Sequence, residues 1–156
     1  MTQNGRPELD DILDAVTAGS RVLVGIAARS LDRSGADLTL AQCRALVTLT
    51  QRGPLSLVGL AGALAINPST ATRMCDRLIA KGLVSRERVA GGVSLRPTPA
   101  GLKVVQSITR ARRDELRRIV SRLGGDDQRD LVRCMEAFRI AAGELGEGEW
   151  ALGWWG

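Results

Sequence analysis

The sequence predicts a mainly helical fold that contains one small β-hairpin, and three features carry this prediction. Apolar residues recur at three- and four-residue spacing over most of the chain, which is the period of amphipathic helices. Ser, Thr or Asn residues precede several of these repeats, where their side chains can cap the first turn of a helix. One stretch around the Gly91-Gly92 pair instead has the composition of two short strands joined by a tight turn.

Length and composition exclude several classes of protein. A chain of 156 residues is long enough for one domain with a real core, so we expect a single domain over residues 1–156. The apolar stretches are short and the N-terminus lacks the pattern of a secretory signal, so we expect no membrane association and a cytoplasmic location. The sequence contains no His, which removes the commonest general base and most transition-metal sites. We therefore expect neither an enzyme nor a protein that holds a metal or a cofactor.

Positive charge is concentrated in the middle of the chain. Residues 69–122 contain thirteen Lys and Arg against four acidic residues, whereas residues 126–156 contain three against seven. A basic central region of this kind indicates a polyanionic partner such as nucleic acid.

The three cysteines, Cys43, Cys75 and Cys134, are far apart and form no C-x-x-C pair, which argues against disulfides and against a zinc site. Each falls on an apolar helical stripe, so we expect three small, buried core residues. The alternative is a thiol that senses oxidants, which requires an exposed site and a lowered pKa.

Helical patterns occupy the first third of the chain. A long helix is expected from Leu9 to a break near residue 34, and a second begins after a capping box formed by Thr39 and Gln42. Ser56 caps a third helix that lasts only about two and a half turns. Because so short a helix is not stable alone, it must pack against its neighbours.

The fourth expected helix has two chemically different faces. It begins with Asn67 as the N-cap and Pro68 as the first residue, and it runs to Lys81, where Gly82 stops it. Helical spacing separates an apolar inner face from an outer face of short polar and basic residues: Ala71, Met74, Cys75, Leu78 and Ile79 inside, and Ser69, Thr72, Arg73, Asp76, Arg77 and Ala80 outside. Two short helices joined by a tight turn, the second of which carries such a polar and basic face, are typical of a helix-turn-helix. The second helix of this motif enters the major groove of DNA.

The remaining elements complete a winged helix-turn-helix. Residues 83–89 and 93–96 are expected to form the strands of a wing, and Thr98 caps a long helix that ends at Gly124-Gly125. A last helix is expected over about residues 126–145. The first helix and the last two are amphipathic and flank the winged helix-turn-helix, which we call the reader. We therefore expect the following organisation: dimerisation helices at 7–33 and 98–145, the winged helix-turn-helix at 38–97, and a Trp-containing tail at 146–156.

Two motifs resemble a known family. Residues 69–86, STATRMCDRLIAKGLVSR, match nearly position for position the pattern S-x-x-T-R-x-x-D-R-L-x-x-x-G-L-V-x-R of the MarR family of bacterial regulators. The TPAG stretch at 98–101 is similar to the T-x-x-G that opens the family's fifth helix. The order and lengths of the expected elements agree over roughly residues 9–145.

The resemblance implies a homodimer that binds double-stranded DNA at a pseudo-palindromic operator, usually as a repressor. It also implies release of the DNA when a small aromatic effector enters a cleft between the dimer helices and the reader. Arg86 matches a family position that braces the wing or touches the DNA backbone. The family's base and phosphate contacts carry over to five residues of the reading helix: Ser69, Thr70, Thr72, Arg73 and Arg77.

The wing departs from the family pattern. Relatives usually carry an Asp-Arg pair in the wing loop, the Arg reaching into the minor groove, whereas this segment is shorter and reads ERVAGGVSLRP. Arg88 or Arg96 could replace the missing residue, although both lie on the strands, and we count Arg88 among the candidate DNA contacts. We expect weaker wing-dependent affinity, or loss of A·T preference at the flanks of the site.

Three further expectations concern residues outside this set. Asp76 is expected to orient Arg73 and Arg77 through an ion pair. The tail that holds Trp150, Trp154 and Trp155 either folds onto the dimer or its effector cleft, or forms a disordered end. The arginines late in the fifth helix are expected to form a solvated face or to pair with the acidic last helix across the dimer: Arg110, Arg112, Arg113, Arg117, Arg118 and Arg122.

Two alternatives to a ligand-relieved repressor stay open. One is a regulator switched by oxidation of a Cys, although relatives that sense organic peroxides usually carry that Cys in the first helix, where this chain has none. The other is a winged-helix module that binds proteins and has weak DNA binding. The shortened wing supports this second alternative, which predicts no salt-dependent affinity for DNA.

Overall fold

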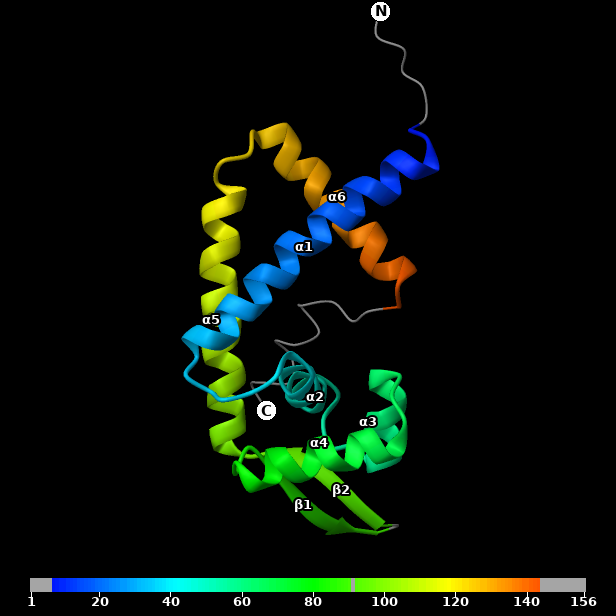
Figure 1. The fold of residues 1–156 in the computed structure, drawn as a ribbon, viewed down its shortest axis with the longest axis vertical. Helices are drawn as coiled ribbons and strands as arrows, with labels where there is room; N and C mark the ends of the chain where they lie inside the picture. The colour runs from blue at the N-terminus through cyan, green and yellow to red at the C-terminus, as the bar shows by residue number, and fades with distance from the viewer. Residues whose placement is uncertain (1–6, 91, 144–156) are drawn as a thin grey trace, which may run out of the picture.

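The computed structural model describes residues 7–90 and 92–143, and Figure 1 shows their arrangement. In chain order the elements are α1 (Leu9–Arg33), α2 (Leu40–Arg52), α3 (Leu57–Leu64), α4 (Pro68–Ala80), β1 (Val84–Val89), β2 (Gly92–Pro97), α5 (Pro99–Val120) and α6 (Gly125–Ala141). The two strands form one antiparallel hairpin. The predicted fold class, a helical winged helix-turn-helix flanked by long helices, is confirmed. No helix in this described part of the chain is both long and apolar enough to cross a membrane.

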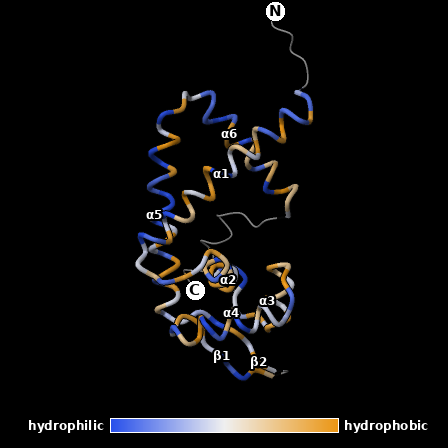
Figure 2. Tube along the Cα trace, viewed as in Figure 1, coloured by the Kyte–Doolittle hydropathy of each residue, from blue (hydrophilic) through white to orange (hydrophobic). Residues whose placement is uncertain are grey.

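The elements gather at two ends of an elongated molecule. Helices α2, α3 and α4 and the hairpin lie at one end, which we call the reading end (residues 40–97). The first part of α1 and all of α6 lie at the other, which we call the platform end (residues 9–24 and 125–141). Helix α5 connects the two ends, and apolar residues recur along the platform helices (Figure 2).

The main hydrophobic core belongs to the reading end. Its buried residues come from α2, α3 and α4, and the hairpin and the start of α5 complete it: Ala45, Leu46, Leu49, Leu60, Leu64, Cys75, Leu78, Leu83, Val84, Leu95 and Val105. Full burial of a single Leu side chain stabilises the fold by about 1.5 to 3 kcal/mol. A smaller cluster of Leu31, Cys43 and Ile108 joins the end of α1 to α2 and α5.

The predicted helix caps are present. The backbone N–H of Gln42 donates to the Thr39 hydroxyl at 3.2 Å, and the backbone N–H of Thr39 donates to the Gln42 side chain at 3.0 Å, which completes the capping box. The side chains of Ser56, Asn67 and Thr98 accept bonds from the first turns of α3, α4 and α5 in the same way. These local bonds fix where each helix of the reading end begins.

Gly101 allows α5 to approach the turn that follows α4. A Cβ atom at this position would lie 2.1 Å from the backbone oxygen of Leu83, closer than any real contact. Thr98 ties the same two segments together, because its hydroxyl donates to the Gly82 carbonyl at 2.6 Å and its N–H to the Leu83 carbonyl at 3.0 Å. The TPAG stretch is therefore a packing joint between the reading helix and α5.

The ends of the last two helices differ from their predicted positions. Helix α5 ends at Val120 and not at Gly124, because the Gln128 side chain donates to the Val120 and Leu123 carbonyls and so replaces further helical bonds. Helix α6 ends at Ala141 and not near residue 145, because Gly143 adopts a φ of +69°, a conformation that ends helices. The predicted tail with its three Trp residues lies outside the described residues.

The prediction for the cysteines is right for two of the three. Cys43 and Cys75 are buried, and this burial raises the pKa of both thiols. Cys134 is exposed, so the prediction that it belongs to the core is wrong. Its helix, α6, buries none of its residues within one chain, and the apolar stripe that carries Cys134 faces solvent.

Candidate nucleic-acid interface

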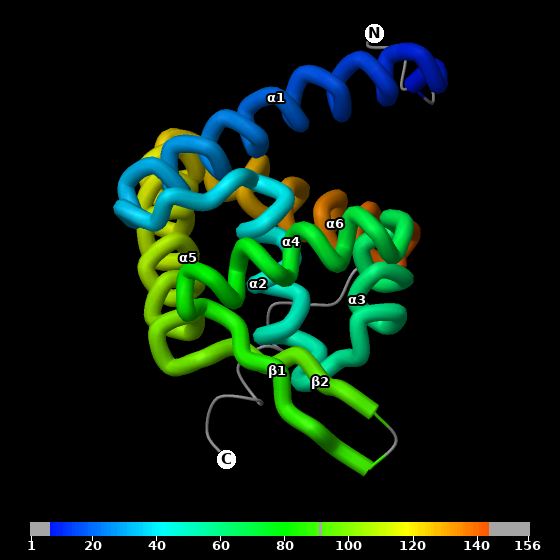
Figure 3. The backbone as a smooth tube through the Cα atoms, turned by 60° about the horizontal axis from the view of Figure 1, so that its bottom comes forward, coloured from blue at the N-terminus to red at the C-terminus, as the bar shows by residue number. Residues whose placement is uncertain are grey.

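The two faces of α4 are separated as the sequence predicts. Ala71, Cys75 and Leu78 are fully buried, whereas Ser69, Arg73 and Arg77 are exposed and Thr70 and Thr72 are half-buried. The Thr72 hydroxyl donates to the Pro68 carbonyl at 2.9 Å, which leaves its oxygen able to accept a further hydrogen bond. Figure 3 shows α4 across the front of the molecule beside the hairpin, and the exposure of Ser69, Arg73 and Arg77 shows that the described chain leaves this face open to solvent.

Arg73 and Arg77 line an open groove between α4 and the start of α2. The groove has a volume of about 240 Å³ and is lined by Thr39, Ala41, Gln42, Thr70, Arg73, Met74 and Arg77. Among the described residues, neither arginine has an acidic partner. Two guanidinium groups that carry their full charge into an open groove can donate to guanine edges or to phosphate oxygens.

Asp76 does not pair with its two helical neighbours. The prediction that it orients Arg73 and Arg77 is wrong, because its carboxylate accepts from the Arg86 guanidinium on β1 at 2.6 Å. The hairpin brings Arg86 against α4, where its guanidinium bonds to Asp76. The arginines of α4 itself, Arg73 and Arg77, make no such bond among the described residues. This pair braces the wing against the reading helix, which is one of the two roles that the resemblance implies for Arg86.

The register of the wing separates its arginines into two faces. Arg86 is paired with Leu95 and Arg88 with Val93, so these residues share one face, because side chains alternate along a strand. Glu87 and Arg96 lie on the opposite face, where the Arg96 Nε atom donates to the Glu87 carboxylate at 3.1 Å. Arg88 is exposed and has no acidic partner in the described part of the chain. Of the two candidates for the missing wing arginine, Arg88 is therefore the one with an uncompensated charge.

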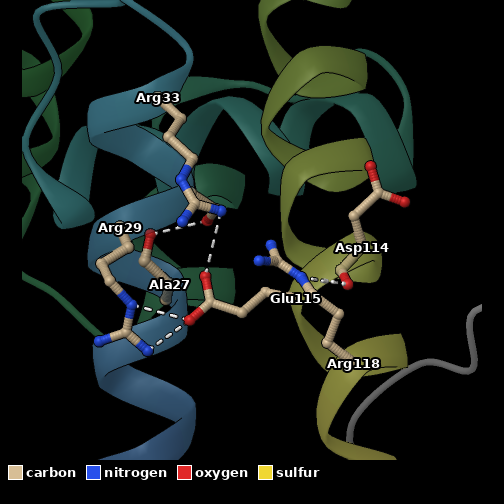
Figure 4. Close-up of polar contacts among 7 residues, drawn as sticks. Ala27, Arg29, Arg33, Asp114, Glu115 and Arg118 are labelled. Carbon is tan, nitrogen blue, oxygen red and sulfur yellow. Dashed lines mark hydrogen bonds and ion pairs between the residues drawn. The ribbon is translucent and has the colours of Figure 1, made fainter. Parts of the chain in front are cut away.

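The late arginines of α5 lie next to an acidic residue that the sequence analysis did not single out. The Glu115 carboxylate is gripped by two arginines of α1: Arg29 donates from Nε at 2.8 Å and Arg33 from its terminal nitrogen at 3.4 Å (Figure 4). The Arg29 hydrogen bond lowers the pKa of Glu115 below its usual value. The sequence marks this position only by an acidic pair, Asp114-Glu115, within a basic run, and it does not identify the partners on α1. The two ion pairs of Glu115, with Arg29 and Arg33, join α1 to α5 where these helices cross.

The platform end exposes a large apolar surface. Exposed residues from α1 are Leu9, Ile12, Leu13, Val16, Val22, Leu23 and Val24, and those from α6 are Leu131, Val132, Met135, Phe138 and Ile140. So many exposed apolar side chains on two helices indicate an interaction site. The described residues contain no group of His, Cys, Asp and Glu side chains arranged to hold a metal ion.

Comparison with known proteins decides the family. The MarR family model matches residues 38–90, which include helices α2, α3 and α4 and the first strand of the wing. The crystal structure of RV1404 from Mycobacterium tuberculosis is 35% identical in sequence, with a TM-score of 0.83 over 92% of this chain and 99% of that one. The chain belongs to the MarR family. Membership supports DNA binding and transcription regulation at the level of the family.

More distant MarR structures share the fold. A MarR-family protein from Bacillus stearothermophilus is 18% identical, with a TM-score of 0.77 over 89% of this chain and 100% of that one. The oxidised form of MarR from E. coli is 22% identical, with a TM-score of 0.69 over 86% and 96%. No curated protein matches the sequence.

Proposed function

We propose that this MarR-family chain is a cytoplasmic, homodimeric transcription regulator, folded as one domain, that binds a pseudo-palindromic operator. The observation that carries the proposal is the outer face of α4, where Ser69 and two arginines without an acidic partner among the described residues are exposed, on a helix with a buried inner face. Such a helix inserts into the major groove and reads base edges. We propose repression, relieved by a small aromatic effector, as the mode of regulation.

The contacts divide by position along the interface. Ser69, Thr70 and Thr72 lie in the first turns of α4 and reach the phosphates and nearest base edges. Arg73 and Arg77, one turn apart on the same face, carry the base contacts of each half-site. The wing adds Arg88 at the backbone or minor groove, and Arg86, held by Asp76, touches phosphate only with its remaining donors.

Dimerisation follows from the platform end. Helix α6 has no buried residue within one chain, and its large apolar side chains are exposed: Phe138 is 54% exposed and Val132 is 70% exposed. Covering these residues with the equivalent helices of a second chain removes their apolar surface from water. The two-fold axis then places two copies of α4 to read half-sites about one helical turn apart.

Selection of bound sequences from random duplex DNA tests the proposal, followed by titration of the selected site against salt. We expect a two-fold symmetric motif, and an affinity that falls steeply with salt because the interface displaces counterions from phosphates. Selection without enrichment, together with an absence of salt-dependent binding, would favour the protein-interaction module instead. Unchanged operator affinity after peroxide treatment would remove the thiol-switch alternative. Burial disfavours Cys43 and Cys75 as the reactive thiol, whereas Cys134 is exposed, so the treatment chiefly tests Cys134.

A further inference from the structure

One ion pair joins the end of the reading helix to the loop that leaves α1. Lys81 is the C-cap residue of α4, and Asp37 lies between α1 and α2. The Lys81 ammonium donates to the Asp37 carboxylate at 2.8 Å and also to the backbone carbonyl of the same residue. Because one acceptor is part of the main chain, the contact fixes the path of the loop and not only the direction of a side chain.

The electrostatics of the helix end explain why these two residues meet. The last turn of a helix carries free carbonyl groups and a partial negative charge, so a carboxylate beside it is unfavourable unless a cation compensates for both. Lys81 is that cation, and its hydrogen bond lowers the pKa of Asp37 below the usual value. The Asp37 side chain is otherwise fully exposed, at 102% of its reference area, so the pair contributes little to stability through burial.

The same loop leads directly into the groove that Arg73 and Arg77 line. Asp37 stands two residues before Thr39, which caps α2 and forms one wall of that groove. The segment after Lys81 is held against α5 by the Thr98 bond to the Gly82 carbonyl. The C-terminal end of α4 is therefore tied on one side to α5 and on the other side, through Lys81 and Asp37, to the loop that follows α1.

We propose that Asp37 and Lys81 are positioning residues for DNA reading. Their pair holds the end of α4 at one angle to α2 and to the loop after α1, so that Arg73 and Arg77 enter the major groove in a single orientation. Neither residue of the pair touches DNA, and Lys81 is engaged with the protein rather than with phosphate. The inference rests on the proposed reading role of α4.

The test is a double-mutant cycle in the full-length dimer. Affinities for the selected operator and for a random duplex are measured over a range of salt for the wild type, Asp37→Asn, Lys81→Gln, both changes together, and Lys81→Arg. Each single neutralisation is expected to lower the ratio of operator to random affinity by roughly fivefold to thirtyfold, since the dimer contains two ties. The double variant is expected to lose no more than either single one, because both remove the same contact. Lys81→Arg is expected to keep the ratio of operator to random affinity. In all of these variants the melting temperature and the salt slope are expected to stay at the wild-type values.

Asp32→Asn is the matched control, because Asp32 is an exposed acid five residues away with no side-chain partner among the described residues. A gain in operator affinity for Asp37→Asn would show that its carboxylate merely repels phosphate, and would overturn the inference. A reduced salt slope for Lys81→Gln would overturn it too, since the slope counts phosphate contacts. Additive losses or unchanged ratios would also contradict it while the proposed function stands, whereas a wild type that binds no operator would overturn both.

Discussion

The reading end and the platform end of this molecule obtain their stability in different ways. At the reading end, three short helices bury Leu46, Leu49, Leu60 and Leu78 completely, and each helix begins with a side-chain cap. At the platform end, α6 has seventeen residues and none of them is buried. Helix α1 shows the contrast within one element, because its buried residues, Ile26, Ser30 and Leu31, all lie in its last part.

The difference shows which part of the fold is complete in one chain. The reading end contains its own core, so its geometry is set by the sequence of a single protomer. The platform end exposes apolar surface that, in the proposed dimer, a second protomer would cover, so the geometry of this end would depend on assembly. The proposed function requires both ends, because the reading end would supply the DNA contacts and the platform end would set the spacing between two reading helices.

The largest expected effect is at the joint between the reader and α5. Gly101→Ala places a Cβ atom into the Leu83 carbonyl, which forces the helix and the turn apart and costs about 3 kcal/mol of unfolding free energy. Gly62→Ala is the control, because a Cβ at this helical position of α3 meets nothing within 4 Å. The control is expected to keep the wild-type free energy of unfolding or to raise it by up to about 1 kcal/mol. Chemical denaturation measures both, and equal stabilities would contradict the close approach.

A charge placed on the platform is expected to separate assembly from folding. Met135→Glu together with Phe138→Glu puts two carboxylates on the exposed stripe of α6, which blocks its burial in a dimer. Sedimentation is expected to give a monomer, and operator affinity is expected to fall by at least about a hundredfold because the second reader is lost. Val58→Glu, on the exposed side of α3, is expected to leave the dimer intact. A double variant that stays dimeric would place the interface elsewhere.

Within the reader, the loss of one groove arginine is expected to have a moderate effect. Arg73→Ala removes a donor that no carboxylate of the described residues shares, and it is expected to cost about 1 to 3 kcal/mol of operator binding, with relaxed specificity if Arg73 reads a base. Binding curves on the operator and on variants of each position measure this loss. Uniform weakening on all sequences would assign Arg73 to phosphate instead.

The smallest expected effect concerns the wing. Arg88→Ala is expected to weaken binding modestly and to reduce the salt slope by about 1 per subunit, because Arg88 has no acidic partner in the described part of the chain. Arg96→Ala is the matched control, since Glu87 already occupies its guanidinium on the opposite face. Unchanged affinity and slope for Arg88→Ala would show that the shortened wing does not touch DNA.

The sequence predicted those parts of the fold that depend on neighbouring residues. Caps at Thr39, Asn67 and Thr98 and the two faces of α4 follow from signals within a few positions, and all are present. The partner of Asp76 was not predictable in this way, because Arg86 reaches it only after the hairpin has folded back on α4. The exposure of Cys134 was missed for a related reason: an apolar stripe shows that a helix seeks a partner, but not whether that partner belongs to the same chain.

The contacts that hold the helices in their relative positions lay beyond the sequence patterns. Glu115 contacts α1 residues more than eighty positions away in the sequence, and Lys81 contacts Asp37, which lies 44 positions away. Charged residues at solvated helix ends and faces are common, so their identities alone do not predict such pairs. The DNA-contact set was predictable to the extent that it lies on one face of one helix.

Chemical protection of the operator by dimethyl sulfate tests the central claim most directly, since this reagent methylates guanine in the major groove and adenine in the minor groove. If the outer face of α4 reads DNA in a dimer, guanines are expected to be protected in two major-groove segments, centred about 10 base pairs apart. The Arg73→Ala variant is expected to lose protection at the same guanines in both segments if Arg73 reads a base. Protection confined to minor-groove adenines, or to a single segment, would contradict the account.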